Sequence, residues 1–115
     1  MVLWIGFDLK AEIEAVGVNN WTALHLVAYY GKEAVADQLL QAGASVSAVD
    51  DNGQTPMHLA ALYGKSSIAN LLLQANASPT AVDKYGDTPA QRAKQHGQVD
   101  LAAILLEAEQ SAALK

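Results

Sequence analysis

Cysteine is absent from the 115 residues of this chain, and positive charge is scarce. Without cysteine there are no disulfides, no thiolate zinc ligands and no cysteine nucleophile. Seven Lys and Arg residues stand against 12 Asp and Glu residues, which gives a net charge of −5. Nucleic acid binding needs a basic patch, whereas these basic residues are spread along the whole chain. We therefore expect neither nucleic acid nor an anionic membrane surface as a partner.

Long hydrophobic runs are also missing. Residues 1–7 are apolar, but Asp8 and Lys10 interrupt them at once, and a signal peptide needs a basic start followed by a longer apolar core. No segment approaches the roughly 20 apolar residues of a membrane span. We therefore expect a soluble, cytoplasmic protein.

A repeat of 33 residues runs through the chain. It separates the threonines Thr22, Thr55 and Thr88, and it equally separates three glycines and three Leu-Leu pairs. The segments 18–50 and 51–83 are identical at 18 of 33 positions. Such self-similarity is typical of solenoids, in which each repeat is one structural unit.

The middle copy begins with a turn followed by a helix. Residues 51–53 form a turn signal in which Gly53 supplies a positive φ. Thr55 is a suitable N-cap, and Pro56 suits the first helical position because its missing N–H costs nothing there. His58, three residues after the cap, is placed to reach back to the turn as Glu does in a capping box.

Glycine and asparagine mark the helix ends in the same copy. The first helix ends at Gly64. A second helix, about 66–75, has one apolar stripe and ends at Asn76, a residue that tolerates the left-handed conformation. Each copy is thus a helix–turn–helix with an extended loop that ends in a tight turn.

The run Thr-Pro-Met-His-Leu-Ala-Ala at 55–61, followed by Gly64, the Leu pair at 72–73 and Ala77, resembles the ankyrin repeat. The resemblance implies an all-α solenoid of stacked helix pairs with projecting β-turn loops. It also implies a non-enzymatic protein-binding module, with no cofactor and no catalytic residue. We predict a partial repeat, two full repeats and a capping repeat with a long last helix, with the bounds 1–17, 18–50, 51–83 and 84–115.

The core positions and the C-terminal cap follow from the register. Two buried stripes are expected, Leu39/Leu72/Leu105 and Val35/Ile68/Leu101. The first helix of the third copy is polar, as a terminal repeat requires. Glu109 replaces the residue that ends the other second helices, so we expect this last helix to continue past it.

The N-terminal segment raises an alternative function. Its apolar residues have no polar cap, and an apolar patch of this kind usually marks an interface. Self-association as a homodimer, or membership of a longer array, is therefore an alternative to partner binding, and folding back as a makeshift cap is the simpler reading. The residues concerned are Val2, Leu3, Trp4, Ile5 and Phe7.

Two groups of residues invite a metal hypothesis. His25 and His58 are equivalent, but packed helices lie roughly 8–10 Å apart, and zinc needs both nitrogens at about 2.0–2.1 Å. We expect each histidine to bond to turn backbone instead. Acidic residues also gather near the turns, where Ca²⁺ binding is conceivable, but Asp50 and Asp83 are turn residues that should accept local N–H groups.

In proteins that resemble this one, partners are held by the turn tips and the exposed side of each first helix. Trp21 and Tyr85 are the strongest candidates, because a turn tip needs no aromatic residue for packing and because aromatics dominate binding hot spots. The surrounding acids indicate a partner surface with some basic character. The positions implied are Val18, Asn19, Trp21, Tyr29 and Tyr30, then Asp51, Asn52, Gln54, Leu62 and Tyr63, then Lys84, Tyr85, Asp87, Gln95 and His96.

Overall fold

A computed structural model describes residues 18–113; the predicted partial repeat and the apolar N-terminal residues fall in 1–17, outside this range. After a short 3-10 turn η1 (Val18–Asn20), six helices follow in three antiparallel pairs. They are α2 (Ala23–Tyr30), α3 (Glu33–Gln41), α4 (Pro56–Leu62), α5 (Ser66–Gln74), α6 (Pro89–Gln95) and α7 (Val99–Ala113). The predicted all-α helix-pair solenoid is confirmed.

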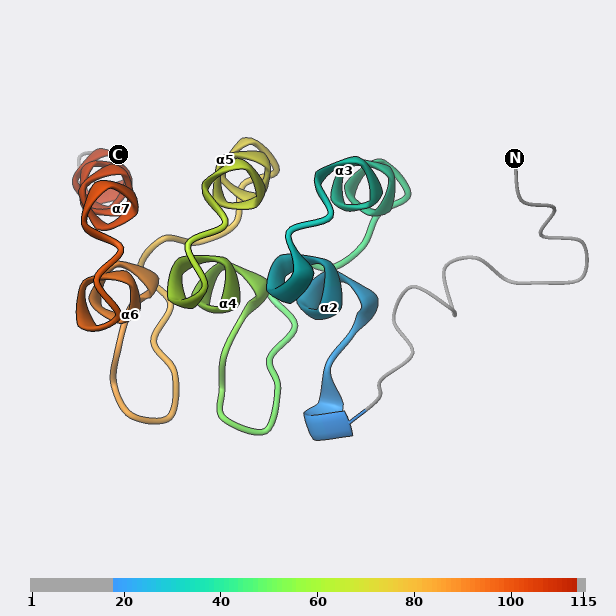
Figure 1. Ribbon diagram of the computed structural model, residues 1–115, viewed down its shortest axis with the longest axis horizontal. Coiled ribbons are helices and arrows are strands. Elements are labelled where there is room, and N and C mark those ends of the chain that lie inside the picture. Colours follow the sequence, from blue (N-terminus) through green and yellow to red (C-terminus); the bar gives the residue numbers. More distant parts are fainter. Residues whose placement is uncertain (1–17, 114–115) are drawn as a thin grey trace, which may run out of the picture.

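The helices form two rows, with α2, α4 and α6 in one and α3, α5 and α7 in the other (Figure 1). Each first helix contacts its successor, and the loops between pairs project on the side of the first row. No helix in the described part of the chain is long and apolar enough to cross a membrane.

Each first helix begins with the capping box that the sequence predicts. The Thr55 hydroxyl accepts the backbone N–H of His58, while Nδ1 of His58 accepts the backbone N–H of Thr55 at 3.1 Å. Thr22 and His25 repeat the arrangement. In the third pair Gln91 takes the place of histidine and accepts through its amide oxygen. Two orphan donors are thereby satisfied at every helix start.

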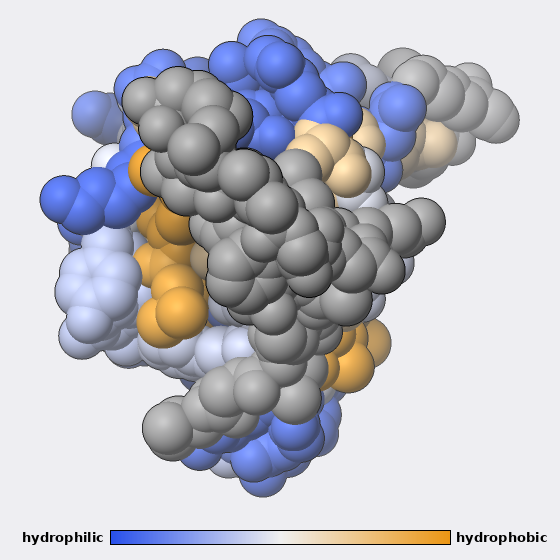
Figure 2. Space-filling view, turned by 90° about the vertical axis from the view of Figure 1, so that its right-hand side faces the viewer, coloured by the Kyte–Doolittle hydropathy of each residue, from blue (hydrophilic) through white to orange (hydrophobic). Residues whose placement is uncertain are grey.

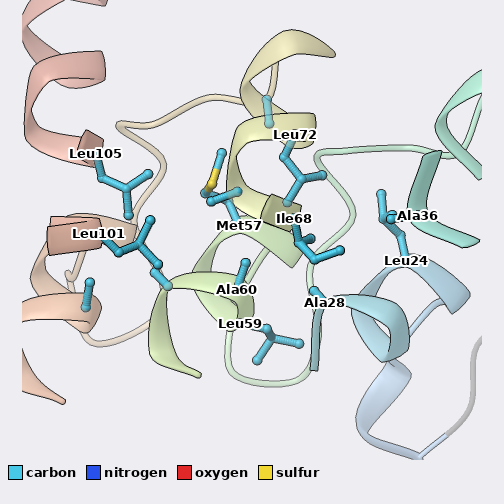
Figure 3. Close-up of a cluster of buried hydrophobic side chains, with 14 of the residues drawn as sticks. Leu24, Ala28, Ala36, Met57, Leu59, Ala60, Ile68, Leu72, Leu101 and Leu105 are labelled. Atoms are coloured by element: carbon cyan, nitrogen blue, oxygen red, sulfur yellow. The ribbon is translucent and has the colours of Figure 1, made fainter. Parts of the chain in front are cut away.

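The core lies between the two rows and between successive pairs (Figure 3). Leu72, Leu105, Ile68 and Leu101 are buried as predicted. Val35 is not: 44% of its surface is exposed. The physical reason is its place in the stack, because among residues 18–113 no helix packs on the side of α3 away from α5.

Hydrophobic side chains accordingly reach the surface at the α2–α3 end of the stack (Figure 2). Leu26, on α2, is another of them. Burying apolar area is worth about 25 cal/mol per Å², so these side chains contribute less to stability than their counterparts in the middle pair.

Residues with positive φ are found at the predicted turns. Asn20 has φ 62°, Gly53 has 74° and Asn76 has 68°. Gly53 also faces the next turn closely, since a Cβ built there would lie 2.9 Å from the backbone nitrogen of Lys84. The last helix continues past Glu109 to Ala113, as expected.

Candidate binding groove

Two equivalent aspartates organise the projecting turns. Oδ1 of Asp50 accepts the backbone N–H groups of Asn52 and Gln54, at 2.8 and 2.9 Å. Asp83 repeats this with the N–H groups two and four residues further on. The predicted role of these carboxylates as acceptors of local N–H groups is confirmed.

The second carboxylate oxygen has a different donor in each turn. Oδ2 of Asp50 accepts the indole N–H of Trp21 at 2.8 Å, from a residue 29 positions earlier. Oδ2 of Asp83 accepts Nε–H of Arg92 at 2.8 Å, and a second guanidinium nitrogen lies 3.5 Å from Asp87. The two turns are thus held by a neutral donor and a charged one.

The expectation that Trp21 is free of any packing role is wrong. Besides its hydrogen bond to Asp50, its ring stacks on His25 with centroids 6.4 Å apart. It also lies 5.4 Å from the ring of Tyr29. The 33-residue period could not reveal this, because the partner of the indole belongs to the following turn.

An aromatic row continues from this point along the first helices. Tyr29 lies between Tyr30 and Tyr63, with ring centroids 4.8 and 4.7 Å away and both neighbours in edge-to-face geometry. Edge-to-face packing is favourable for aromatic rings. The row joins α2 to the end of α4, and Tyr30 and Tyr63 stay exposed.

Tyr85, at the last turn tip, is the most exposed aromatic of the groove, at 62%. The ammonium group of Lys84 lies 5.3 Å from its ring centroid, and the guanidinium carbon of Arg92 lies 5.2 Å from it. Both distances are typical of cation–π interactions. The ring therefore already holds two cations of its own repeat.

These side chains surround a surface groove of about 610 Å³ between the turns and the first helices. Of the predicted binding positions, the groove brings together Asn19, Trp21, Tyr29, Asn52, Gln54, Leu62, Tyr63 and Tyr85. Its lining does not include Tyr30, Asp51, Lys84, Asp87, Gln95 and His96. Gln54 lines it while being almost fully buried, and its carbonyl oxygen is occupied by His25.

Three further residues line the groove: Asp50, Leu59 and Arg92. Sequence reasoning assigned Asp50 to the turn alone and Arg92 to the polar cap. A signal was present, because Arg92 stands where the other copies have Leu26 and Leu59. A charged residue at a position otherwise held by leucine indicates a specific partner, which here is Asp83.

His25 and His58 are bonded to turn backbone, as predicted. Nε2 of His25 donates to the carbonyl of Gln54, and Nε2 of His58 donates to that of Asp87, both at 2.9 Å. Since Nδ1 accepts a backbone N–H, each ring is neutral in the fold. Burial lowers the pKa of both histidines, although the carbonyl bonds and nearby aspartates act against it.

The pKa of Asp83 is also displaced. Burial alone would raise it, but the N–H of Asp87, the Arg92 guanidinium and the N–H of Tyr85 together hold the pKa of this carboxyl below its usual range. Asp83 is therefore ionised at neutral pH. It acts as a fixed anionic anchor for Arg92, which in turn forms one end of the groove.

A comparison with protein families agrees with this architecture. The family model for ankyrin repeats matches residues 3–83 and 24–115, with three copies in the chain. The chain belongs to the ankyrin-repeat family. Members of this family are typically non-enzymatic and generally serve as protein–protein interaction modules. A search of curated proteins finds no match.

Proposed function

We propose that this chain is a binding module that holds a protein partner through the groove between its turns and first helices. One observation carries the proposal: four aromatic side chains, Trp21, Tyr29, Tyr63 and Tyr85, converge on a single groove. Aromatic residues bury large areas at little entropic cost, and they dominate binding hot spots. The general role of ankyrin repeats supports the same function.

The groove suits a peptide segment of the partner better than a small molecule. It is a surface channel that spans three successive repeats, from η1 to α6, rather than an enclosed cavity. Its walls combine ring faces with polar groups such as Asn52 and Arg92. An apolar centre with polar edges is the usual anatomy of protein interfaces.

The test starts from peptides that bind the full chain, selected from a random display library. Tyr63→Ala and Tyr85→Ala should each weaken the selected peptides, with at least one loss of about 2 kcal/mol, or roughly 30-fold in Kd. Trp21→Ala is less informative, because it also removes the donor to Asp50. The readout is isothermal titration calorimetry, with unchanged circular dichroism to show that the fold is intact.

The matched control is Val99→Ala, at an exposed position on α7 outside the groove. It should leave affinity unchanged. Peptides that ignore both tyrosine variants and depend on the α3–α5–α7 row instead would refute the proposed surface.

A further inference from the structure

The last turn contains a complete binding arrangement for a guanidinium group. Arg92 donates to Asp83 at 2.8 Å, lies 3.5 Å from Asp87, and rests 5.2 Å from the centre of the Tyr85 ring. A carboxylate partner and an aromatic face are together what a guanidinium prefers, because it pairs in a plane and stacks on rings.

The middle turn has the same carboxylate without the cation. Asp50 occupies the position of Asp83, but Leu59 stands where Arg92 stands, and the donor to Oδ2 is the neutral indole of Trp21. Among residues 18–113, no Lys or Arg forms an ion pair with Asp50. Its negative charge is therefore not balanced by a neighbouring cation.

Aromatic faces lie beside this carboxylate as well. Trp21 contacts both Asp50 and Tyr29, and the Tyr29 ring is 4.7 Å from that of Tyr63. All four side chains line the same groove. The middle of the groove thus has the carboxylate and rings of the last turn, and it has open space where the last turn has Arg92.

We infer that the middle of the groove takes an arginine side chain of the partner, with its guanidinium next to Asp50 and its flat face on the rings of Tyr29 and Tyr63. The inference rests on the proposed function and specifies the chemistry of the partner. Charge supports it: the two turns carry four aspartates (50, 51, 83 and 87) and two cations (Lys84 and Arg92), which leaves two negative charges. Arginine fits better than lysine, whose strongly hydrated ammonium does not stack.

The probe is N-acetyl-arginine amide, compared with N-acetyl-citrulline amide, which has nearly the same shape and no charge. Both are titrated into the ¹⁵N-labelled full chain and followed by NMR. The arginine probe should shift the Trp21 indole and Asn52 amide signals and bind about fivefold or more tightly than citrulline, the ratio for a cation–π contact of about 1 kcal/mol. Equal binding of the two probes, or shifts outside the groove, would overturn the inference, as would tighter binding of the lysine analogue.

Two variants remove the two halves of the arrangement. Tyr29→Leu installs the residue that the middle repeat has at this position, Leu62, and should weaken the arginine probe about fivefold. Asp50→Asn keeps an oxygen for the turn N–H groups but loses the charge, and should remove the preference for arginine over citrulline. The control is Asp37→Asn, which removes one exposed charge on α3 and should change nothing. If Asp50→Asn fails to fold, Tyr29→Leu decides alone.

The outcomes separate this inference from the proposed function. Selected peptides that need Tyr63 or Tyr85, combined with equal binding of arginine and citrulline, would overturn the inference and leave the proposed function standing. Specific arginine binding in the groove, combined with peptides that ignore both tyrosines, would support the inference and refute the proposed surface.

Discussion

The middle and last helix pairs have the same turn, the same threonine cap and the same core register, but different surroundings. Residues of α4 are almost all buried, because α2 lies on one side of this helix and α6 on the other. Residues of α6 are buried only at Pro89, Ala90 and Ala93, and the rest of the helix is polar. Within residues 18–113, α6 has one neighbouring first helix, α4.

This difference separates two kinds of position in the repeat. The positions that agree, such as Asp50 and Asp83, satisfy the backbone of their own repeat and are needed wherever the repeat stands. The positions that differ, such as Leu59 and Arg92, depend on what lies beside the repeat. Matched substitutions in the two pairs can therefore measure how much stability comes from the neighbours.

The largest effect is expected from Leu72→Ala in the middle pair. Leu72 is fully buried, so the truncation should lower the free energy of unfolding by about 2–5 kcal/mol, through lost burial and the cavity left behind. Leu106→Ala, in the last pair at a residue 46% exposed, should cost less than about 1 kcal/mol. Urea titration measures both values. A cost below about 1 kcal/mol for Leu72→Ala would contradict the assigned register.

A smaller difference is expected between Gly53→Ala and Gly86→Ala. Both residues have positive φ, which costs about 1–2 kcal/mol for a residue with a Cβ. Only at Gly53 does the new Cβ meet the backbone nitrogen of Lys84, at 2.9 Å, where it would disturb the bond from that N–H to the carbonyl of Asn52. Gly53→Ala should therefore be the more destabilising variant in thermal unfolding. Equal costs would show that the two turns move apart freely.

The smallest effect concerns pH and the His58→Gln variant, which copies Gln91 of the last pair. The pKa of His58 is lowered chiefly by burial, so the unfolded chain binds protons below pH 6.5 that the folded chain refuses. Stability should be complete above pH 6.5 and should fall as the pH drops below it.

The variant should lose about 1 kcal/mol at pH 7.5, because the bond to the carbonyl of Asp87 is gone. It should then lose less stability than the original chain between pH 7.5 and 5.5, with His25 supplying the remaining dependence. Denaturant titrations at the two pH values provide the measurement. A slope unchanged by the substitution would place the pH dependence elsewhere.

Much of the fold could be predicted because it depends on local chemistry that recurs every 33 residues. A threonine three residues before a histidine predicts the cap, and Asn20, Gly53 and Asn76 predict the positive φ at their turns. These interactions join residues a few positions apart, so the sequence displays both partners together. The extension of α7 past Glu109 follows in the same way, from the absence of a helix-ending residue.

The groove could be predicted only in part, because its decisive contacts join different repeats or depend on a place in the stack. The bond from Trp21 to Asp50 connects residues 29 positions apart, and nothing local announces it. Val35 has the same register as Ile68 but lies on the α3 side that α5 does not cover. Equivalence within a repeat therefore predicts conformation better than it predicts burial or partners.

The bonds from His25 to the carbonyl of Gln54 and from His58 to that of Asp87 are one joint used twice, with the same geometry each time. A joint of this head-to-tail kind never closes on itself, so the array has translational symmetry without a natural length. A duplicate of residues 51–83 inserted after residue 83 would meet the same donor before it and offer the same donor after it. Such a chain can grow by gene duplication in steps of 33 residues, and Gln91, whose side chain serves only its own cap, marks where the symmetry is broken.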